Sequence, residues 1–319
     1  MEQIGLLYDG QIYDLQTAEA LNIKGDIIKA DDSKESLEIL RHSCAHMMAQ
    51  AIKELYPEAK FFVGPVVKEG FYYDFKVESK ISDEDLPAIE KKMKEIADRK
   101  LPITRHETTK EEFYEKFKND ELKQAVLKNI KDDTLTIYKQ GDFEDLCRGP
   151  HLPNTRMIRS FKLTRVAGAY LGGDEKNEMI TRIYGIAFFD KQALFDYTKM
   201  IEEAKKRDHR KLGTELELFT FNDDVGAGLP MWLPNGARLR SKLEHLLYKA
   251  HRVRGYEPVR GPEILKSEMW KISGHYANYK ENMYFTTIDE QEYGIKPMNC
   301  VGHIQIFKNN LVSYKDLPK

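Results

Sequence analysis

The chain has 319 residues, which is enough for two or three domains and a sizeable buried core. Hydrophobic residues make up 41% of it and aromatic residues 11%, which excludes an intrinsically disordered chain. The 50 basic and 52 acidic residues balance, which excludes a globally basic nucleic-acid-binding protein but leaves local basic patches open.

The three cysteines, Cys44, Cys147 and Cys300, are far apart and odd in number, which argues against a disulfide framework. No apolar run is long enough to cross a bilayer, and the first residues lack the layout of a signal peptide. We therefore expect a soluble, cytoplasmic protein with no membrane partner.

The N-terminal half mixes strand and helix patterns. Residues 1–31 alternate apolar and polar residues around the turn Asp9-Gly10, which predicts strands too few to fold alone. A helix opens near Asp32 or Ser33 and includes residues 41–51. Two strands follow within residues 61–77, and neighbouring side chains of the second strand point to opposite faces.

Further elements follow in chain order. Residues 83–99 predict an amphipathic surface helix, residues 110–130 more helix and residues 134–147 a return to strand. Residues 160–190 show strand patterns around a Gly-Gly turn. Residues 191–212 predict a long charged helix, which is a natural connector between domains.

A new unit begins near Gly213. A Gly/Pro-rich stretch leads into a predicted helix over residues 239–255 and a strand over residues 256–265. The last recognisable element is residues 292–307, and the chain stops as if cut within a domain.

Two histidines stand four residues apart in "RHSCAHMMAQA", residues 41–51. On a helical wheel His42 and His46 lie roughly 140–180° from the centre of the apolar stripe. They are then either two solvated surface histidines or a paired imidazole site, because side chains at positions i and i+4 can converge on one metal or substrate. A buried structural role is disfavoured by the wheel.

A second motif, "DLCRGPHLP", carries Asp145, Cys147 and His151. Gly149-Pro150 forbids a regular helix there, because proline disfavours helical geometry at the preceding residue. If the two motifs meet, His42 and His46 from the first and Cys147 and His151 from the second supply four ligands that suit tetrahedral zinc. The alternative is a metal-free hydrolytic pocket in which the histidines and Asp145 position a water molecule.

With "RHSCAHMMAQA", "GFYYDF" and "CRGPHLPN" in this order, the chain resembles the editing domain of bacterial threonyl-tRNA synthetases. "KRDHRKLGTELELF", "GHYANYKENMYF" and "IKPMNCVGHIQIF" extend the resemblance over essentially the whole chain. The family attaches threonine to tRNA(Thr) with ATP and Mg, and hydrolyses serine mistakenly attached to that tRNA.

The resemblance implies an α+β, multi-domain fold. It divides the chain into a partial ubiquitin-like (TGS) module at 1–31, an α/β editing domain at 32–190, a linker helix at 191–212 and the start of a class II antiparallel-sheet catalytic domain at 213–319. Residues 243–265 resemble class II motif 1, which implies a homodimer.

The same resemblance assigns site residues. The implied catalytic residues of editing are His42, His46, Lys123, Asp145, Cys147 and His151. Tyr72 or Tyr73 is expected to border the seryl substrate and Met298 the threonine pocket. Cys300 matches one ligand of a zinc ion, of which there is one per full-length subunit, with two further ligands expected beyond residue 319. The family's editing pocket is taken to work without metal, so zinc at the histidine–cysteine cluster is the second interpretation.

Competing functions remain. The ATP-binding motifs that follow motif 1 are not found, so we expect the 319-residue chain to lack synthetic activity by itself. A freestanding trans-editing hydrolase and a non-catalytic tRNA-binding paralogue are the alternatives. Basic residues after the cysteine motif are either a tRNA contact or a solvated face; they are Arg148, Arg156, Arg159, Lys162 and Arg165.

Overall fold

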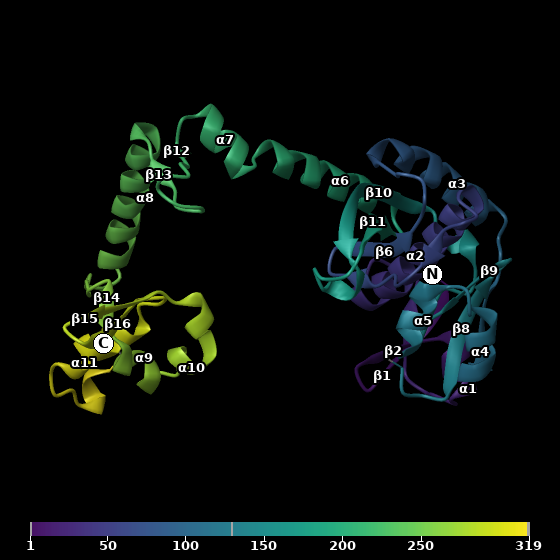
Figure 1. Ribbon diagram of the computed structural model, residues 1–319, viewed down its shortest axis with the longest axis horizontal. Coiled ribbons are helices and arrows are strands. Elements are labelled where there is room, and N and C mark those ends of the chain that lie inside the picture. Colours follow the sequence, from purple (N-terminus) through teal and green to yellow (C-terminus); the bar gives the residue numbers. More distant parts are fainter. Residues whose placement is uncertain (1, 129, 318–319) are drawn as a thin grey trace. The chain divides into compact units, whose positions relative to one another are not determined.

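The computed structural model describes residues 2–128 and 130–317, so the outermost ends of the predicted 1–31 and 213–319 domains lie outside the described residues. The chain divides into two compact units, Met1–Lys206 and Arg207–Lys319 (Figure 1). Every pairing between its named strands is antiparallel, and helices pack on the sheets, which confirms the predicted α+β class. The finer boundaries at residues 31, 190 and 212 stay a prediction.

The N-terminal segment is a small three-stranded sheet with one helix. Its elements are β1 (Gln3–Tyr8), β2 (Gln11–Asp14), α1 (Leu15–Ala20) and β3 (Asp26–Lys29), in the strand order β2-β1-β3. Asp9 and Gly10 adopt positive φ angles of 49° and 74°, as the Asp-Gly turn requires. Ile4 and Ile28 are buried in the core that the segment shares with the following helix.

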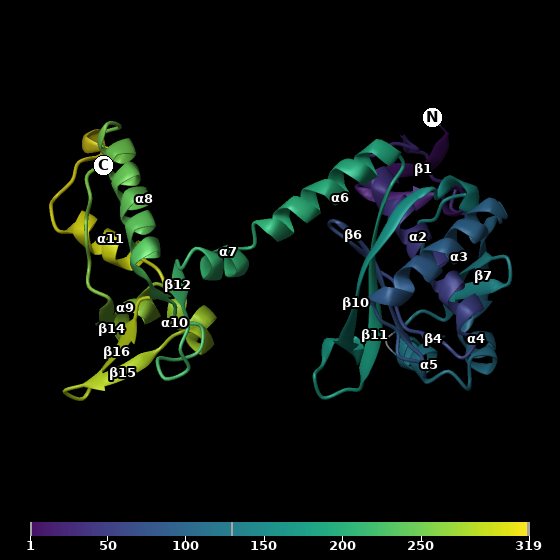
Figure 2. The ribbon, with the colours of Figure 1, turned by 90° about the horizontal axis from the view of Figure 1, so that it is seen from above.

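That helix, α2 (Lys34–Leu55), is the centre of the first unit (Figures 1 and 2). It packs against β6 (Gly70–Lys76) and β11 (Met179–Phe188), and α3 (Leu86–Asp98) packs beside it. The sheet runs in the order β10-β11-β6-β4, with β5 paired to β6; the other strands are β4 (Lys60–Phe61), β5 (Val66–Val67) and β10 (Ser160–Tyr170).

A second sheet of the first unit carries the cysteine motif. Its order is β7-β8-β9, with β7 (Ile103–Thr109), β8 (Thr134–Gln140) and β9 (Phe143–Leu146). Helices α4 (Lys110–Lys116) and α5 (Glu121–Lys128) lie between β7 and β8 in the chain. Cys147 leaves the end of β9, where its N–H donates to the carbonyl oxygen of Thr136.

The connector differs from the single helix expected over residues 191–212. It consists of α6 (Lys191–Lys206) and α7 (His209–Glu215). The break has a local cause, because the side chain of Asp208 accepts a hydrogen bond from the N–H of Arg210 and caps a new helix.

The second unit has a two-stranded sheet, then a long helix, then a three-stranded sheet with short helices. It contains β12 (Phe219–Thr220), β13 (Met231–Trp232), α8 (Pro234–Arg252), β14 (Ile264–Lys266), α9 (Ser267–Ile272), α10 (His275–Tyr279), β15 (Phe285–Ile288), β16 (Gln291–Ile295) and α11 (Cys300–Lys308). The strand expected over 256–265 is confined to β14, where it pairs with β16. In the described residues, no helix has the length and apolar character needed to cross a bilayer.

Candidate functional site

The structure brings the two histidine and cysteine motifs together. His42 and His46 come from α2, and Cys147 and His151 from the loop after β9; one ligand atom from each lies within 4.8 Å of all the others. The Sγ of Cys147 lies 3.1 Å from Nε2 of His42 and 3.2 Å from Nε2 of His151. We call these four residues the His–Cys cluster.

Of the two alternatives for His42 and His46, the solvated one does not fit the structure, and the wheel was wrong to disfavour burial. His46 is only 3% exposed and His42 is partly buried. The reason is tertiary, since α3, β6, β11 and β9 all pack against α2, and the loop after β9 brings Cys147 and His151 to its histidines. A helix enclosed on all sides buries polar groups that a wheel alone assigns to water.

Burial keeps the imidazoles of the cluster neutral. It lowers the pKa of His42 to about 4, and it lowers the pKa of His46 and of His151 well below their ordinary value, with help from the neighbouring imidazoles. Burial also raises the pKa of the Cys147 thiol far above its ordinary value. The cluster at neutral pH is therefore an uncharged set of hydrogen-bonding groups.

A buried ion pair adjoins the cluster. Lys123 on α5 and Asp145 on β9 are 3% and 2% exposed, and Nζ of Lys123 donates to Oδ1 of Asp145. The hydroxyl of Tyr73 on β6 donates to Oδ2 of the same carboxylate. Burial and this carboxylate raise the pKa of Tyr73 well above its ordinary value, so the phenol stays protonated. The ring centroid of Tyr73 lies 6.2 Å from that of His46, so the ion pair and the cluster form one site.

Of the two candidate tyrosines, only Tyr73 belongs to this site. Tyr72 lies on the other face of β6, where the guanidinium of Arg182 sits 3.9 Å from the centre of its ring. Arg182 is held there by two hydrogen bonds of 2.6 and 2.7 Å to Asp74. The strand alternation recognised in the sequence separates the two rings, but it does not say which face holds the site.

Sequence reasoning missed three residues of the site. Ser43 accepts a hydrogen bond of 2.8 Å from the N–H of Leu152, and its Oγ lies 3.2 Å from Nδ1 of His151. The ring centroid of Tyr138 lies 4.4 Å from that of His151. Asp14 accepts a hydrogen bond from the N–H of His151. Ser43 stands inside the first motif and could have been found there, whereas nothing local marks Tyr138 or Asp14.

The remaining predicted residues lie in the second unit. Cys300 is the first residue of α11, and its Sγ lies 3.7 Å from Nε2 of His275, a neighbour that sequence reasoning did not single out. Met298 is exposed by 55%. Nothing local in "GHYANY" marks His275 as a neighbour of Cys300, which lies 25 residues further along the chain.

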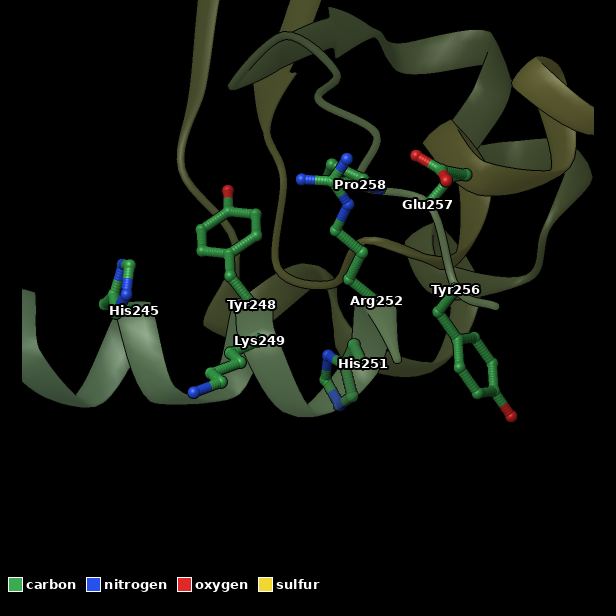
Figure 3. A pocket seen from close by; sticks show the side chains of 8 residues that line it. All are labelled: His245, Tyr248, Lys249, His251, Arg252, Tyr256, Glu257 and Pro258. Atoms are coloured by element: carbon green, nitrogen blue, oxygen red, sulfur yellow. The ribbon is translucent and has the colours of Figure 1, made fainter. Parts of the chain in front are cut away.

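The second unit also holds a cavity of about 420 Å³. Figure 3 shows its lining side chains on α8 and on the segment that follows, and they are His245, Tyr248, Lys249, His251, Arg252, Tyr256, Glu257 and Pro258. All eight fall within the 243–265 region for which the resemblance implies a dimer contact, and none belongs to the His–Cys cluster.

Comparison with known proteins identifies the class of module that this geometry belongs to. The family model "Threonyl and Alanyl tRNA synthetase second additional domain" matches residues 135–184. The match covers nearly all of β8, the whole of β9 and β10, the cysteine loop and the first part of β11, and so it includes Asp145, Cys147 and His151. Residues 135–184 of the first unit are thus similar to an accessory domain of threonyl- and alanyl-tRNA synthetases.

The particular relatives are threonine–tRNA ligases, which confirms the resemblance stated from the motifs. The chain is 70% identical over 317 residues to the enzyme of Campylobacter jejuni, covering 99% of this chain and 52% of that protein. It is 74% identical over 288 residues to that of Campylobacter lari and 67% identical over 317 residues to that of Helicobacter hepaticus. The chain spans about half the length of the curated relatives it matches.

A solved structure described as the RNA binding domain of threonyl-tRNA synthetase from Cryptosporidium parvum is 47% identical, covering 35% of this chain and 28% of that one, with a TM-score of 0.34.

Proposed function

We propose that this chain carries the hydrolytic editing site of a threonine–tRNA ligase, which removes serine wrongly attached to tRNA(Thr). The observation that supports it most strongly is the buried His–Cys cluster beside the Lys123–Asp145–Tyr73 group. Editing is physically necessary because serine differs from threonine by one methyl group, which gives only about 1–3 kcal/mol of discrimination on binding.

The proposed reaction is hydrolysis of the seryl ester. A water oxygen attacks the ester carbonyl carbon, the bond from that carbon to the ribose oxygen breaks, and a proton from the water ends on the ribose oxygen. The neutral imidazoles can accept hydrogen bonds from the water and orient it. Because an imidazole with a pKa of about 4 is a weak base, the role of His42 is to orient the water more than to store its proton.

Lys123 supplies the positive charge of the site. Its ammonium group is buried with Asp145, in surroundings where a charge interacts more strongly than in water. When the ester carbonyl becomes an oxyanion, Lys123 can stabilise it while Asp145, which also accepts from the hydroxyl of Tyr73, holds the ammonium group in place. Removing one such group typically reduces the rate by about 100-fold to 1,000-fold.

The second interpretation is a zinc ion in the His–Cys cluster, and the donor types fit. In a tetrahedral zinc site sulfur and nitrogen ligands lie about 3.5 Å apart, close to the observed 3.1 and 3.2 Å. Three histidines and one cysteine would hold the ion, which would supply Lewis acidity. We favour the metal-free site because the resemblance to threonyl-tRNA synthetases implies an editing pocket that works without metal.

The whole protein's activity is a further part of the proposal. It joins threonine to tRNA(Thr) with ATP and Mg, as a cytoplasmic homodimer formed through residues 243–265. Cys300 would be one ligand of the zinc that recognises threonine, where the ion would bind the threonine hydroxyl. One soft thiolate donor near one imidazole, that of His275, is compatible with such a site.

The test is release of serine from pre-charged Ser-tRNA(Thr), with Thr-tRNA(Thr) as the substrate control. His42→Ala and Lys123→Ala should each slow serine release by about 100-fold or more. The exposed residues His106 on β7 and Lys128 on α5 provide matched controls, since His106→Ala and Lys128→Ala should retain the wild-type rate.

Two results would contradict the proposal. Binding of tRNA without serine release by the wild type would favour the non-catalytic paralogue. Serine release that disappears on chelation and returns with one zinc per chain would favour the metal interpretation.

A further inference from the structure

The N-terminal segment is attached to the domain that holds the His–Cys cluster. The side chain of Gln16 at the start of α1 donates from Nε2 to the carbonyl oxygen of Ile103 at 2.6 Å and accepts at Oε1 from the N–H of Arg105 at 2.7 Å. Through these two bonds the side-chain amide of Gln16 pairs with the edge of β7, as the backbone of a neighbouring strand would. The segment is therefore part of the same packed body as the cluster, whose core also includes Ile4 and Ile28.

Asp14 is the residue of this segment that reaches the site. It is only 2% exposed, and both of its carboxylate oxygens accept hydrogen bonds. Oδ1 accepts from the N–H of Thr17 at 2.8 Å. Oδ2 accepts from the hydroxyl of Tyr138 at 2.6 Å and from the backbone N–H of His151 at 3.0 Å. One buried carboxylate thus joins α1, β8 and the cysteine loop.

The cysteine loop fits directly over this carboxylate. Gly149 has a φ of 71°, and a Cβ atom there would lie 2.8 Å from Oδ2 of Asp14 and 2.5 Å from the hydroxyl of Tyr138. Only glycine both adopts this left-handed backbone conformation without strain and leaves room for Asp14 and Tyr138 to lie this close. The loop backbone at Gly149, two residues before His151, therefore lies directly against the carboxylate of Asp14.

His151 is consequently fixed at three atoms. Asp14 accepts from its backbone N–H, Ser43 lies 3.2 Å from its Nδ1, and Cys147 lies 3.2 Å from its Nε2. The two contacts to the ring orient the imidazole. The backbone from which the ring extends is fixed by the bond from the N–H of His151 to Asp14, next to the bond from the N–H of Leu152 to Ser43. Hydrogen bonds to a charged acceptor are roughly twice as strong as neutral ones.

We propose that Asp14 is a positioning residue of the editing site, which holds the backbone of His151 and so places its imidazole against Cys147. The expected effect on hydrolysis rests on the proposed function, whereas the positioning of His151 by Asp14 does not. It gives the N-terminal segment a defined role as one wall of the editing domain. Asp14 acts through His151 and does not touch the substrate.

The kinetic test compares Asp14→Asn with Asp26→Asn in the full chain. Asp26 is an exposed aspartate of β3 in the same segment, so it is a matched control. Asp14→Asn should lower the kcat of serine release by about 10-fold to 100-fold with little change in KM. Displacing a catalytic group by about 1 Å slows the chemical step more than it weakens binding. Asp26→Asn should match the wild type.

A double-mutant cycle separates positioning from general destabilisation. If Asp14 acts through His151, adding Asp14→Asn to His151→Ala should have no further effect on kcat. An effect of Asp14→Asn that is the same in both backgrounds would overturn the proposal, because it would show that the carboxylate only stabilises the fold.

A readout independent of hydrolysis is the alkylation rate of Cys147 by iodoacetamide, followed by mass spectrometry with Cys300 as the internal reference. Asp14→Asn should speed alkylation of Cys147 at least several-fold, while Asp26→Asn should not. An unchanged rate in Asp14→Asn would overturn the inference. If alkylation responds but the wild type releases no serine, the proposed function fails and the positioning role stands.

Discussion

At the scale of single residues, the site depends on charges that have no access to bulk water. Lys123 and Asp145 are both nearly inaccessible, so each is the main compensation for the other. Removing one partner of such a pair leaves an uncompensated buried charge, which is far more costly than losing an exposed pair.

Asp145→Asn should therefore lower the free energy of unfolding by about 3–5 kcal/mol. Asp132→Asn, which breaks the exposed pair between Asp132 and Arg148, should lower it by less than about 1 kcal/mol. Urea denaturation of both variants measures the difference. Equal effects of the two substitutions would show that the pair of Lys123 and Asp145 is not sequestered from water.

Gly64 is a second single-residue determinant, because it lies against the ring that binds Asp145. A Cβ atom at Gly64 would lie 2.4 Å from two ring carbons of Tyr73, so the ring would have to move. Gly64→Ala should cost about 1–3 kcal/mol of stability and reduce serine release. Gly261→Ala is the control, because a Cβ atom there meets nothing within 4 Å. Full activity of Gly64→Ala would show that the position of Tyr73 is unimportant.

At the scale of elements, α2 determines the electrostatics of the site. His42 and His46 are enclosed because α2 packs against β6, β11 and β9. A protonated imidazole is poorly solvated there, whereas in the unfolded chain it titrates near pH 6.5. The folded state therefore binds fewer protons than the unfolded state between the two pKa values.

This difference predicts a pH dependence of stability. The contribution of His42 is fully present above about pH 6.5 and is lost as the pH falls toward its folded pKa of about 4. His46 and His151, whose pKa values are also lowered, act in the same direction. The free energy of unfolding, measured between pH 4 and 8, should fall less steeply with acid in His42→Gln than in the wild type.

The exposed His106 provides the control for this experiment. His106→Gln should keep the wild-type slope, because the side chain of His106 is exposed and loses little hydration on folding. If His42→Gln leaves the slope as steep as in the wild type, His42 is not desolvated in the folded protein.

At the scale of the whole molecule, the two units bury their apolar residues very unequally. Both hydrophobic clusters of the described residues lie in the first unit. In the second unit Trp270 and Val301 are buried, while α8 exposes four leucines, namely Leu239, Leu243, Leu246 and Leu247. Exposed apolar surface on this scale is typical of a surface that another chain segment or subunit covers.

We therefore expect a fragment of residues 1–206 to fold cooperatively by itself and to retain the serine-release rate of the full chain. A fragment of residues 207–319 should bind a hydrophobic dye such as ANS and unfold with little cooperativity. Calorimetry and dye fluorescence on the two fragments test this. Non-cooperative unfolding of the 1–206 fragment would contradict the division into units.

The sequence alone determined the local geometry and the relationship to threonine–tRNA ligases. Three local features could be predicted because each depends only on residues that are neighbours in the chain. They are the Asp9-Gly10 turn, the helical pattern of α2 and the strand alternation at Tyr72 and Tyr73. The motifs around Cys147 likewise indicated the related proteins, which the comparisons bear out.

Only the tertiary structure decided which of these residues meet. The burial of His46, the choice of Tyr73 over Tyr72 and the reach of Asp14 to His151 all depend on which sheet covers which face of a helix or strand. Asp14 and His151 are 137 residues apart in the chain, so no local pattern links them. Contacts of that separation arise from the packing of whole elements, because burial and hydrogen bonding are properties of the assembled core.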